Sequence, residues 1–283
     1  TCDWSSDVCS SDLTVADDDG TLVPTYAPVQ LTLSGDNVTG GVISYGSTQT
    51  EWSDPAYMNG YVVVTAKRGT DISVFFIGTE DGVVTRRDIT GVSAASVGSA
   101  PVCVSYTGST SVYAYIVAGT NDVYMVRSDT STLVTFTCTA SPGDLNGLVL
   151  WNGRMIAWSN LWDKIIFSDP FQFNPDSAEY STSWPSLNYI RAGYTDDGIS
   201  QVVPRNTDLV VVKPSGWFSV TGVLGVSAAC RQMNDTLGIY ANDPIDQHNN
   251  INYFTTNTGF TDYAINLFAI IGGRVDIVAD RKS

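Results

Sequence analysis

The chain has 283 residues, of which 43% are hydrophobic, 11% aromatic and only 15% charged. This composition excludes a disordered chain and is typical of one or two ordinary domains, or of one larger all-β domain. The formal charge is −15, but six aspartates and no base lie within residues 1–19, so the rest has 23 acidic and 14 basic residues, a charge of −9. Such a surface argues against wrapping a nucleic acid in a basic groove.

The first residues differ in composition from everything that follows. Residues 1–13, TCDWSSDVCSSDL, lack the basic start and apolar centre of a signal peptide. The run SSDVCSSDL resembles translated sequencing-adapter read-through at the ends of metagenomic reading frames. We therefore predict a non-native or disordered leader over residues 1–23 and a folded domain over residues 24–283, with a natural acidic leader as the alternative.

From Pro24 onward, short β-type runs recur every 40 to 50 residues or so, which is the signature of a repeat architecture. The first strands of the predicted units are Tyr61–Thr65, Val102–Tyr106, Leu148–Trp151 and Ile199–Val203. The second strands are Ile72–Ile77, Val112–Val117, Met155–Trp158, Leu209–Val212 and Ile251–Thr255. The third strands are Val83–Arg86, Val123–Val126, Lys164–Ser168, Trp217–Val220 and Phe260–Tyr263. The fourth strands are Asp88–Val92, Leu133–Thr137 and Gly225–Ala229.

Turn chemistry separates these runs. Asn152-Gly153 is the residue pair that a two-residue hairpin prefers. An insertion at about residues 169–194 contains three prolines, and because proline removes a ladder donor we predict a projecting loop there rather than a further strand. The final segment, GGRVDIVADRKS, is predicted to be the first strand of a unit without its partners.

A four-stranded sheet that repeats at this interval cannot bury both faces alone, and stacking of such sheets around an axis solves that problem. The sequence therefore predicts an all-β fold, a β-propeller of four-stranded antiparallel blades. About five blades are recognisable, Val29–Ser44 is a possible remainder of a sixth, and we expect truncation at one or both ends. A β-sandwich is the alternative architecture, although its strands need not keep this interval.

Few residues suggest catalysis or metal binding. The five cysteines form no CxxC pair, and the one histidine, His248, lies in a polar run that is typical of a surface loop. Cys103 and Cys138 could pair if their strands are adjacent, but buried free thiols are the favoured interpretation. We predict no catalytic residue, no metal site and no cofactor, and hence that the chain is not an enzyme.

Two features keep a carbohydrate-related function open. Carboxylates lie near many predicted turns, where aspartate is common for local reasons, and two of them facing one groove would suit glycoside hydrolysis. These are Asp54, Asp81, Asp122, Asp163, Asp169, Asp196, Asp197 and Glu179. Aromatic residues of the insertion and its flanks are the predicted interaction surface: Trp162, Phe171, Phe173, Tyr180, Trp184 and Tyr189. Packing of the insertion onto its own unit is the alternative for these aromatic residues.

Three segments resemble a recurring pattern in structural propellers of tailed bacteriophages, among them tail, nozzle and head-to-tail stabilising proteins. They are Trp151–Trp158 (WNGRMIAW), Lys164–Pro170 (KIIFSDP) and Asp208–Gly222 (DLVVVKPSGWFSVTG). The resemblance covers about 75 residues. It implies a non-enzymatic virion protein, assembled in the host cytoplasm, that docks as a homo-oligomer onto tail or portal/connector proteins, with no sequence-specific nucleic-acid binding and no membrane span. The alternative is a secreted carbohydrate-binding or glycoside-hydrolase-like propeller.

Overall fold

The structure is a computed structural model of the whole chain. It describes residues 51–106, 109–141, 143–172, 182–193 and 197–233 with their side chains. It describes the backbone alone at residues 14–16, 22–24, 49–50, 173–174, 179–181, 234, 245–248, 251–257, 265–271 and 274–281. Every regular element in this part of the chain is a β-strand.

Five larger sheets follow one another along the described chain. The first contains β3 (Gln49–Trp52), β4 (Ala56–Met58), β5 (Tyr61–Arg68), β6 (Asp71–Gly78) and β7 (Val84–Ile89). The second contains β8 (Val102–Val104), β9 (Tyr113–Val117), β10 (Asp122–Arg127) and β11 (Leu133–Thr137). The third contains β12 (Gly147–Trp151), β13 (Arg154–Trp158), β14 (Lys164–Phe167) and β17 (Tyr189–Arg191). The fourth contains β18 (Gln201–Pro204), β19 (Leu209–Lys213), β20 (Gly216–Thr221) and β21 (Ala229–Asn234). The fifth contains β22 (Ile245–His248), β23 (Ile251–Asn257), β24 (Ile265–Ile271) and β25 (Arg274–Arg281).

Two small hairpins complete the described strands. Strands β1 (Thr14–Ala16) and β2 (Leu22–Pro24) pair with each other, and β15 (Gln172–Asn174) pairs with β16 (Glu179–Ser181). All the described pairings are antiparallel. No helix long and apolar enough to cross a membrane occurs among the residues that the structure describes.

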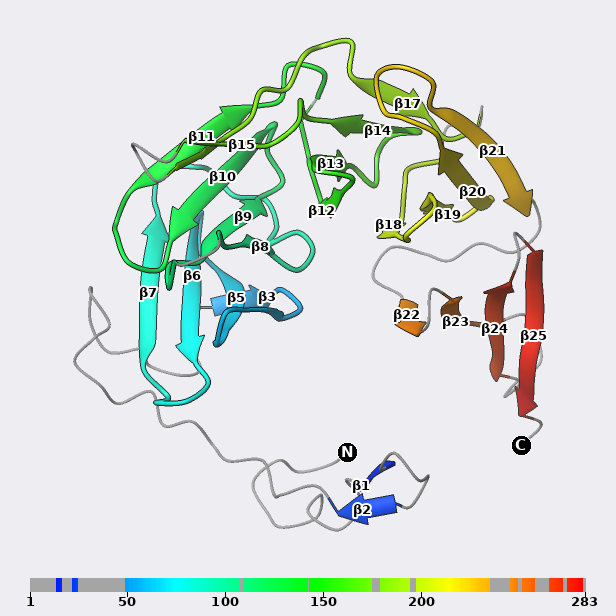
Figure 1. Cartoon of the computed structure of the whole chain (residues 1–283), viewed down its shortest axis with the longest axis horizontal. Coiled ribbons are helices and arrows are strands. Elements are labelled where there is room, and N and C mark those ends of the chain that lie inside the picture. Colours follow the sequence, from blue (N-terminus) through cyan, green and yellow to red (C-terminus); the bar gives the residue numbers. More distant parts are fainter. Residues whose placement is uncertain are drawn as a thin grey trace.

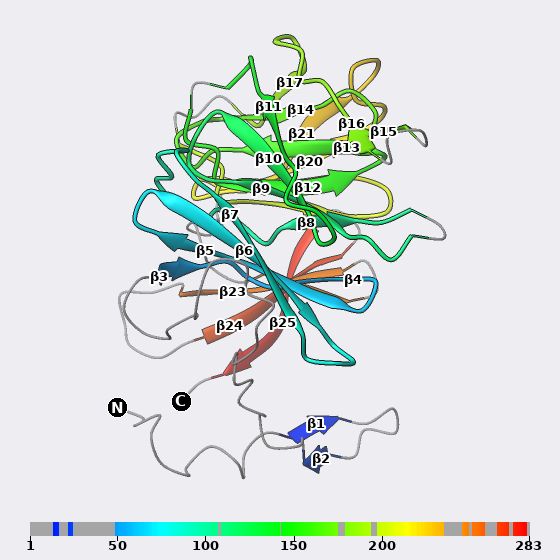
Figure 2. The same cartoon turned by 90° about the vertical axis from the view of Figure 1, so that its left-hand side faces the viewer.

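The sheets are arranged side by side around a common centre (Figure 1). In the second, third and fourth sheets, the first strand lies nearest the centre and the last strand lies at the periphery. Figure 2 shows the same stack from the side. This radial arrangement confirms the predicted all-β architecture of repeated four-stranded sheets.

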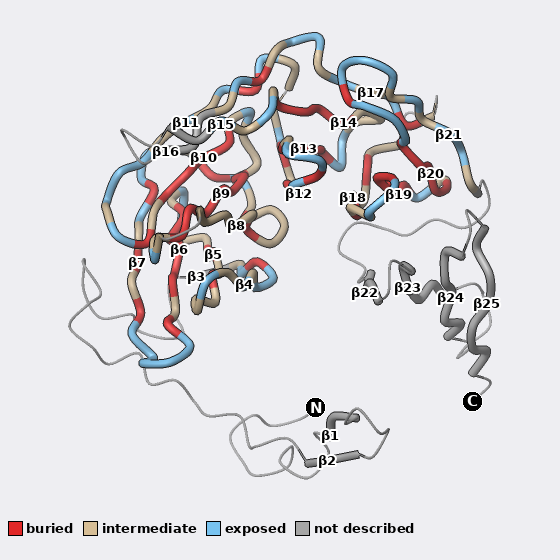
Figure 3. Tube along the Cα trace, viewed as in Figure 1, coloured by how far each residue is buried: buried red, intermediate tan, exposed pale blue. Residues whose placement is uncertain are grey.

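Neighbouring sheets bury each other's faces, as the central strands show. All five residues of β9 are buried, because Ala114 and Ile116 pack toward the first sheet while Tyr113 and Tyr115 pack toward the third. The buried segments lie mainly on the inner and middle strands (Figure 3). A strand covered on both faces has no polar alternation, which explains the continuous apolar runs in the sequence.

The insertion differs from its prediction as a projecting loop. It contains the hairpin β15–β16 and the strand β17, which pairs with β14 and is the outer strand of the third sheet. The prolines fall between these strands rather than within them, so they do not prevent pairing.

Several strand boundaries also differ from their predictions. In the first sheet, β5 is the second strand rather than the first, and Val83–Arg86 and Asp88–Val92 contribute to the single strand β7. The predicted strand Gly225–Ala229 is mostly a turn with a left-handed Gly225, so β21 begins at Ala229.

The last sheet shows further differences. Strand β25 pairs with β24 as an outer strand, so it is not an unpartnered first strand. His248 lies in β22 rather than in a loop. Residues 1–13, Val29–Ser44 and the predicted strand Phe260–Tyr263 lie outside the described residues.

Candidate functional site

The seam between the third and fourth sheets holds a buried lysine. Lys213 ends β19, and its side chain is 0% exposed. Its Nζ donates to the carbonyl oxygen of Ala192 at 3.1 Å and lies 2.8 Å from Asp197 Oδ1. Asp197 Oδ2 in turn accepts the backbone N–H of Ser215 at 2.9 Å, in the turn that follows Lys213. The ammonium therefore ties the end of the third sheet to the β19–β20 hairpin.

A second polar contact crosses the same seam nearer the centre. The indole Nε1 of Trp151, at the end of β12, donates to the carbonyl oxygen of Arg205 at 2.8 Å. Arg205 forms a bidentate pair with Asp208, with nitrogen to oxygen distances of 2.7 and 2.6 Å. Ser219 Oγ donates to the same carboxylate at 2.5 Å. These contacts fix the loop before β19 against the third sheet.

Within the FSDP segment, the buried Ser168 closes a strand pair. The backbone N–H of Ser168 donates to the carbonyl oxygen of Met155 at 2.9 Å, and the Met155 N–H donates to Ser168 Oγ at 3.0 Å. Ser128 makes the same two contacts with Val112, and Ser53 makes them with Thr65. Each of these serines precedes an aspartate, so a Ser-Asp pair recurs in the first three sheets.

The insertion reaches back across the second sheet. Asp169 accepts hydrogen bonds from the side chains of Ser183 and Asn188, which fixes the base of the insertion. Thr139 Oγ1, just after β11, donates to the carbonyl oxygen of Trp184 at 2.8 Å. The ring of Phe171 packs edge-on against Tyr115 at a centroid distance of 5.2 Å. The insertion is therefore a brace between the second and third sheets.

The six predicted interaction residues fall into three groups. Trp184 is only 5% exposed and Phe171 packs against the same core cluster, so these two belong to the brace and not to a free surface. The side chains of Phe173 and Tyr180 lie outside the described residues, although their backbones pair in β15–β16. Trp162 is half-buried and Tyr189 is 42% exposed.

Lys164 joins Trp162 and Tyr189 into one patch. Its Nζ lies 4.8 Å from the centroid of each ring, a cation–π arrangement with both. Arg191, 59% exposed, lies 3.8 Å from Asp163 beside them. Trp162, Lys164, Tyr189 and Arg191 together form the blade-three patch.

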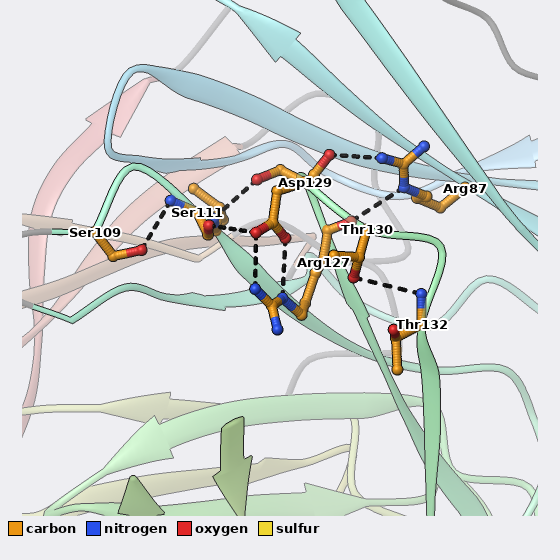
Figure 4. Close-up of polar contacts among 9 residues, drawn as sticks. Arg87, Ser109, Ser111, Arg127, Asp129, Thr130 and Thr132 are labelled. Carbon is orange, nitrogen blue, oxygen red and sulfur yellow. Dashed lines mark hydrogen bonds and ion pairs between the residues drawn. The ribbon is translucent and has the colours of Figure 1, made fainter. Parts of the chain in front are cut away.

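Sequence reasoning missed the polar cluster between the first and second sheets (Figure 4). Arg87 on β7 donates through Nε to the carbonyl oxygen of Arg127 at 3.2 Å and through Nη2 to that of Ser128 at 2.7 Å. Arg127 forms a bidentate pair with Asp129 at 2.9 and 2.7 Å, and Ser111 Oγ donates to the same carboxylate at 2.8 Å. Burial lowers the pKa of Arg87, an effect that the nearby Asp129 opposes.

The same triad of arginine, aspartate and serine occurs three times. The members are Arg86, Asp88 and Ser73; Arg127, Asp129 and Ser111; and Arg205, Asp208 and Ser219. Burial acts to raise the pKa of each aspartate, but the arginine and serine hydrogen bonds outweigh it, so all three pKa values are lowered. The Arg-x-Asp spacing at residues 86–88 and 127–129 is the signal that could have revealed two of them.

The carboxylates that kept glycoside hydrolysis open do not gather on the central strands. Strands β8, β12 and β18 carry neither aspartate nor glutamate. Asp169 and Asp197 are used in the contacts described above, while Asp196 and the side chain of Glu179 lie outside the described residues. No group of three His, Cys, Asp or Glu side chains in the described part of the chain could hold a metal ion.

The three cysteines of the described sheets are free thiols. Burial raises the pKa of Cys103 to about 12. Burial also raises the pKa of Cys230 to about 11, although a backbone hydrogen bond from Gly193 and the charge of Lys213 oppose the shift. Burial and the charge of Asp122 raise the pKa of Cys138. Thiols of this kind are protonated at neutral pH and are poor nucleophiles.

Comparison with solved structures decides the fold. A candidate 6-phosphogluconolactonase from Bacteroides fragilis aligns with a TM-score of 0.52 and 13% identity, over 81% of this chain and 69% of that one. A candidate 6-phosphogluconolactonase from Bacteroides uniformis aligns with a TM-score of 0.50 and 11% identity, over 79% of this chain and 68% of that one. The chain is a β-propeller. No protein-family model and no curated protein matches the sequence.

This comparison overturns the prediction that the chain is not an enzyme, because propellers of the same fold carry the name of an enzymatic activity. The prediction rested on the absence of familiar catalytic motifs. Propeller active sites are assembled from separate blades, so their residues form no local motif that a single sequence displays.

Proposed function

We propose that this propeller is a structural protein of a tailed-bacteriophage virion that docks onto neighbouring tail or head-to-tail connector subunits, as a homo-oligomer. The proposal is supported mainly by the packing of two phage-like segments, KIIFSDP and DLVVVKPSGWFSVTG, against each other. Phe167 of KIIFSDP shares one core cluster with Leu209, Phe218 and Val220 of DLVVVKPSGWFSVTG. The resemblance therefore extends to residues that build one seam together, beyond isolated turns.

The polar groups of these segments act within the seam. Ser168 fastens β13 to β14, and Lys213 binds the carbonyl oxygen of Ala192. Lys213, Trp151 and Arg87 each join successive blades by donating to backbone carbonyl groups. A rigid scaffold of this kind with exposed outer loops suits a protein that binds other subunits.

The blade-three patch is the proposed docking surface. Tyr189 and Arg191 are 42% and 59% exposed at the outer edge of the third blade. Tryptophan, tyrosine and arginine are the residues most often responsible for binding energy at protein interfaces. Leu187, 84% exposed, lies two residues before Tyr189 and extends the apolar part of this rim.

The experiment is co-expression of the chain with the portal and tail proteins encoded by adjacent genes, followed by measurement of binding affinity. We expect a complex with at least one of them, and a double variant Tyr189→Ala with Arg191→Ala should bind roughly tenfold more weakly or worse. Val226→Ala, at an 83% exposed position on the fourth blade, is the matched control and should bind normally. Failure to bind any such protein, or a gene neighbourhood devoted to sugar metabolism, would contradict the proposal.

Lactone hydrolysis is the second candidate, because two propellers of similar fold are named for it. A shared fold does not transfer an activity by itself, so the measurement must be direct. Incubation of the purified chain with 6-phosphogluconolactone, with acid release followed against a buffer blank, tests it. Turnover above the blank supports this candidate, and acid release equal to the blank removes it. The docking role does not depend on the result.

A further inference from the structure

The sequence contains three Asn-Gly pairs, Asn59-Gly60, Asn146-Gly147 and Asn152-Gly153. An asparagine followed by glycine is chemically labile, because the glycine nitrogen, with no side chain beside it, can attack the asparagine side-chain carbonyl carbon. That attack expels ammonia and closes a succinimide ring. Water then opens the ring to aspartate or isoaspartate.

Two of the three pairs are restrained. Asn59 Nδ2 donates to the carbonyl oxygen of Ser109 at 3.0 Å. The Asn146 side-chain oxygen accepts the backbone N–H of Asn160 at 3.0 Å, and Gly147 is buried beneath Trp158. In each case the reacting amide is held by a hydrogen bond that must break before attack.

The third pair lacks such a side-chain hydrogen bond among the described residues. Asn152 and Gly153 are both exposed in the two-residue turn between β12 and β13, with φ angles of 49° and 70°. The Asn152 side chain makes no hydrogen bond within the part of the chain that the structure describes. Asn59-Gly60 has nearly the same φ angles, 50° and 79°, so the two turns differ chiefly in the side-chain contact.

We propose that Asn152 is a deamidation site of the folded protein, converted ahead of Asn59 and Asn146. The product adds a negative charge to a chain that is already acidic. Isoaspartate also lengthens the backbone of the turn whose Gly153 carbonyl oxygen accepts the N–H of Phe171 at 2.9 Å. Deamidation at this turn therefore affects a hydrogen bond that holds the start of the insertion.

The test is to incubate the intact folded chain in mildly alkaline buffer and to follow deamidation of each Asn-Gly peptide by mass spectrometry, with isoaspartate labelling. Asn152 should convert roughly fivefold faster than Asn59, the ratio expected for one net hydrogen bond. The same chain in denaturant is the control, because there the three pairs should convert at similar rates. The variant Asn152→Gln should abolish the early product while the other two peptides are unchanged.

Conversion of Asn59 or Asn146 as fast as Asn152 in the folded chain would overturn the proposal. So would an intact Asn152 in the folded chain under conditions in which the denatured chain converts.

Discussion

The indole N–H of Trp151 donates a 2.8 Å hydrogen bond to the carbonyl oxygen of Arg205, 54 residues later in the chain. The bond joins the innermost strand of the third blade to the loop that enters the second strand of the fourth. Because Trp151 is only 5% exposed, this donor has little access to water. Each seam described above contains a contact of this kind, from a side chain of one blade to the backbone of the next.

The variant Trp151→Phe should therefore be destabilised by about 1–3 kcal/mol, because it leaves the Arg205 carbonyl without this donor and shortens a buried ring. Urea unfolding followed by tryptophan fluorescence measures the change. The control is Trp52→Phe, since Trp52 is 49% exposed and stacks on Phe75 through its ring, which phenylalanine keeps. Equal stability of the two variants would show that the cross-seam bond contributes nothing.

Arg87→Lys tests the seam between the first and second blades. Lysine keeps the charge but cannot reach two carbonyl oxygens with a planar fork, so we expect a loss of about 1–2 kcal/mol in unfolding free energy. Arg191→Lys, at an exposed position with one distant partner, is the matched control and should change stability by less than about 0.5 kcal/mol. If lysine is tolerated at position 87 as well as at position 191, the Arg87 hydrogen bonds to the second blade do not stabilise the fold.

Stability should fall in acid. The pKa values of Asp88, Asp129 and Asp208 are lowered in the folded chain, so folding favours their ionised forms. Their contribution is fully present above the ordinary aspartate pKa of about 4 and is lost as the pH falls through the lower folded values. Urea midpoints measured between neutral pH and acid should show this decline.

Asp208→Asn should flatten that decline, since Asp208 is the most buried of the three carboxylates. Asp144→Asn is the control, because Asp144 is exposed and forms no ion pair among the described residues. If both variants leave the acid profile unchanged, the Asp208 contact is not a source of acid sensitivity.

Phe171→Ala should loosen the brace while leaving the propeller folded. The change removes the ring contact with Tyr115, so limited proteolysis should cut within the insertion sooner than in the parent chain. Leu187→Ala removes an 84% exposed side chain from the same insertion and should leave the cleavage rate unaltered. A cleavage rate of Phe171→Ala that matches that of Leu187→Ala would contradict the bracing role.

The architecture could be predicted from the sequence because sheets buried on both faces leave long apolar runs at a regular interval. The hairpin at Asn152-Gly153 was equally predictable, since its left-handed φ angles demand these residue types. The insertion was predicted to be a loop because of its prolines. That prediction was wrong, since the strand β17 follows the last of these prolines and pairs with β14. Local patterns do not show that a segment packs on another sheet.

The candidate site was less predictable for the same reason. Trp162 and Tyr189 were chosen as aromatic residues of the insertion and its flanks and lie together, but Trp184 was chosen by the same rule and is buried in the core between the second and third blades. Lys213 is the last residue of β19, and its ammonium lies in a seam that depends on Ala192, about twenty positions earlier. Contacts between blades depend on long-range geometry, which residue type and spacing do not specify.

The brace also limits how such a protein can evolve. In a simple repeat protein, one unit can be duplicated, deleted or exchanged because each unit contacts only its two neighbours, through interfaces of similar shape. Here a segment that belongs to the third blade completes the outside of the second, with Trp184 and Thr139 as the point of attachment. The two blades must therefore be inherited as a pair, and a recombination junction placed between them would separate the insertion from the surface it covers.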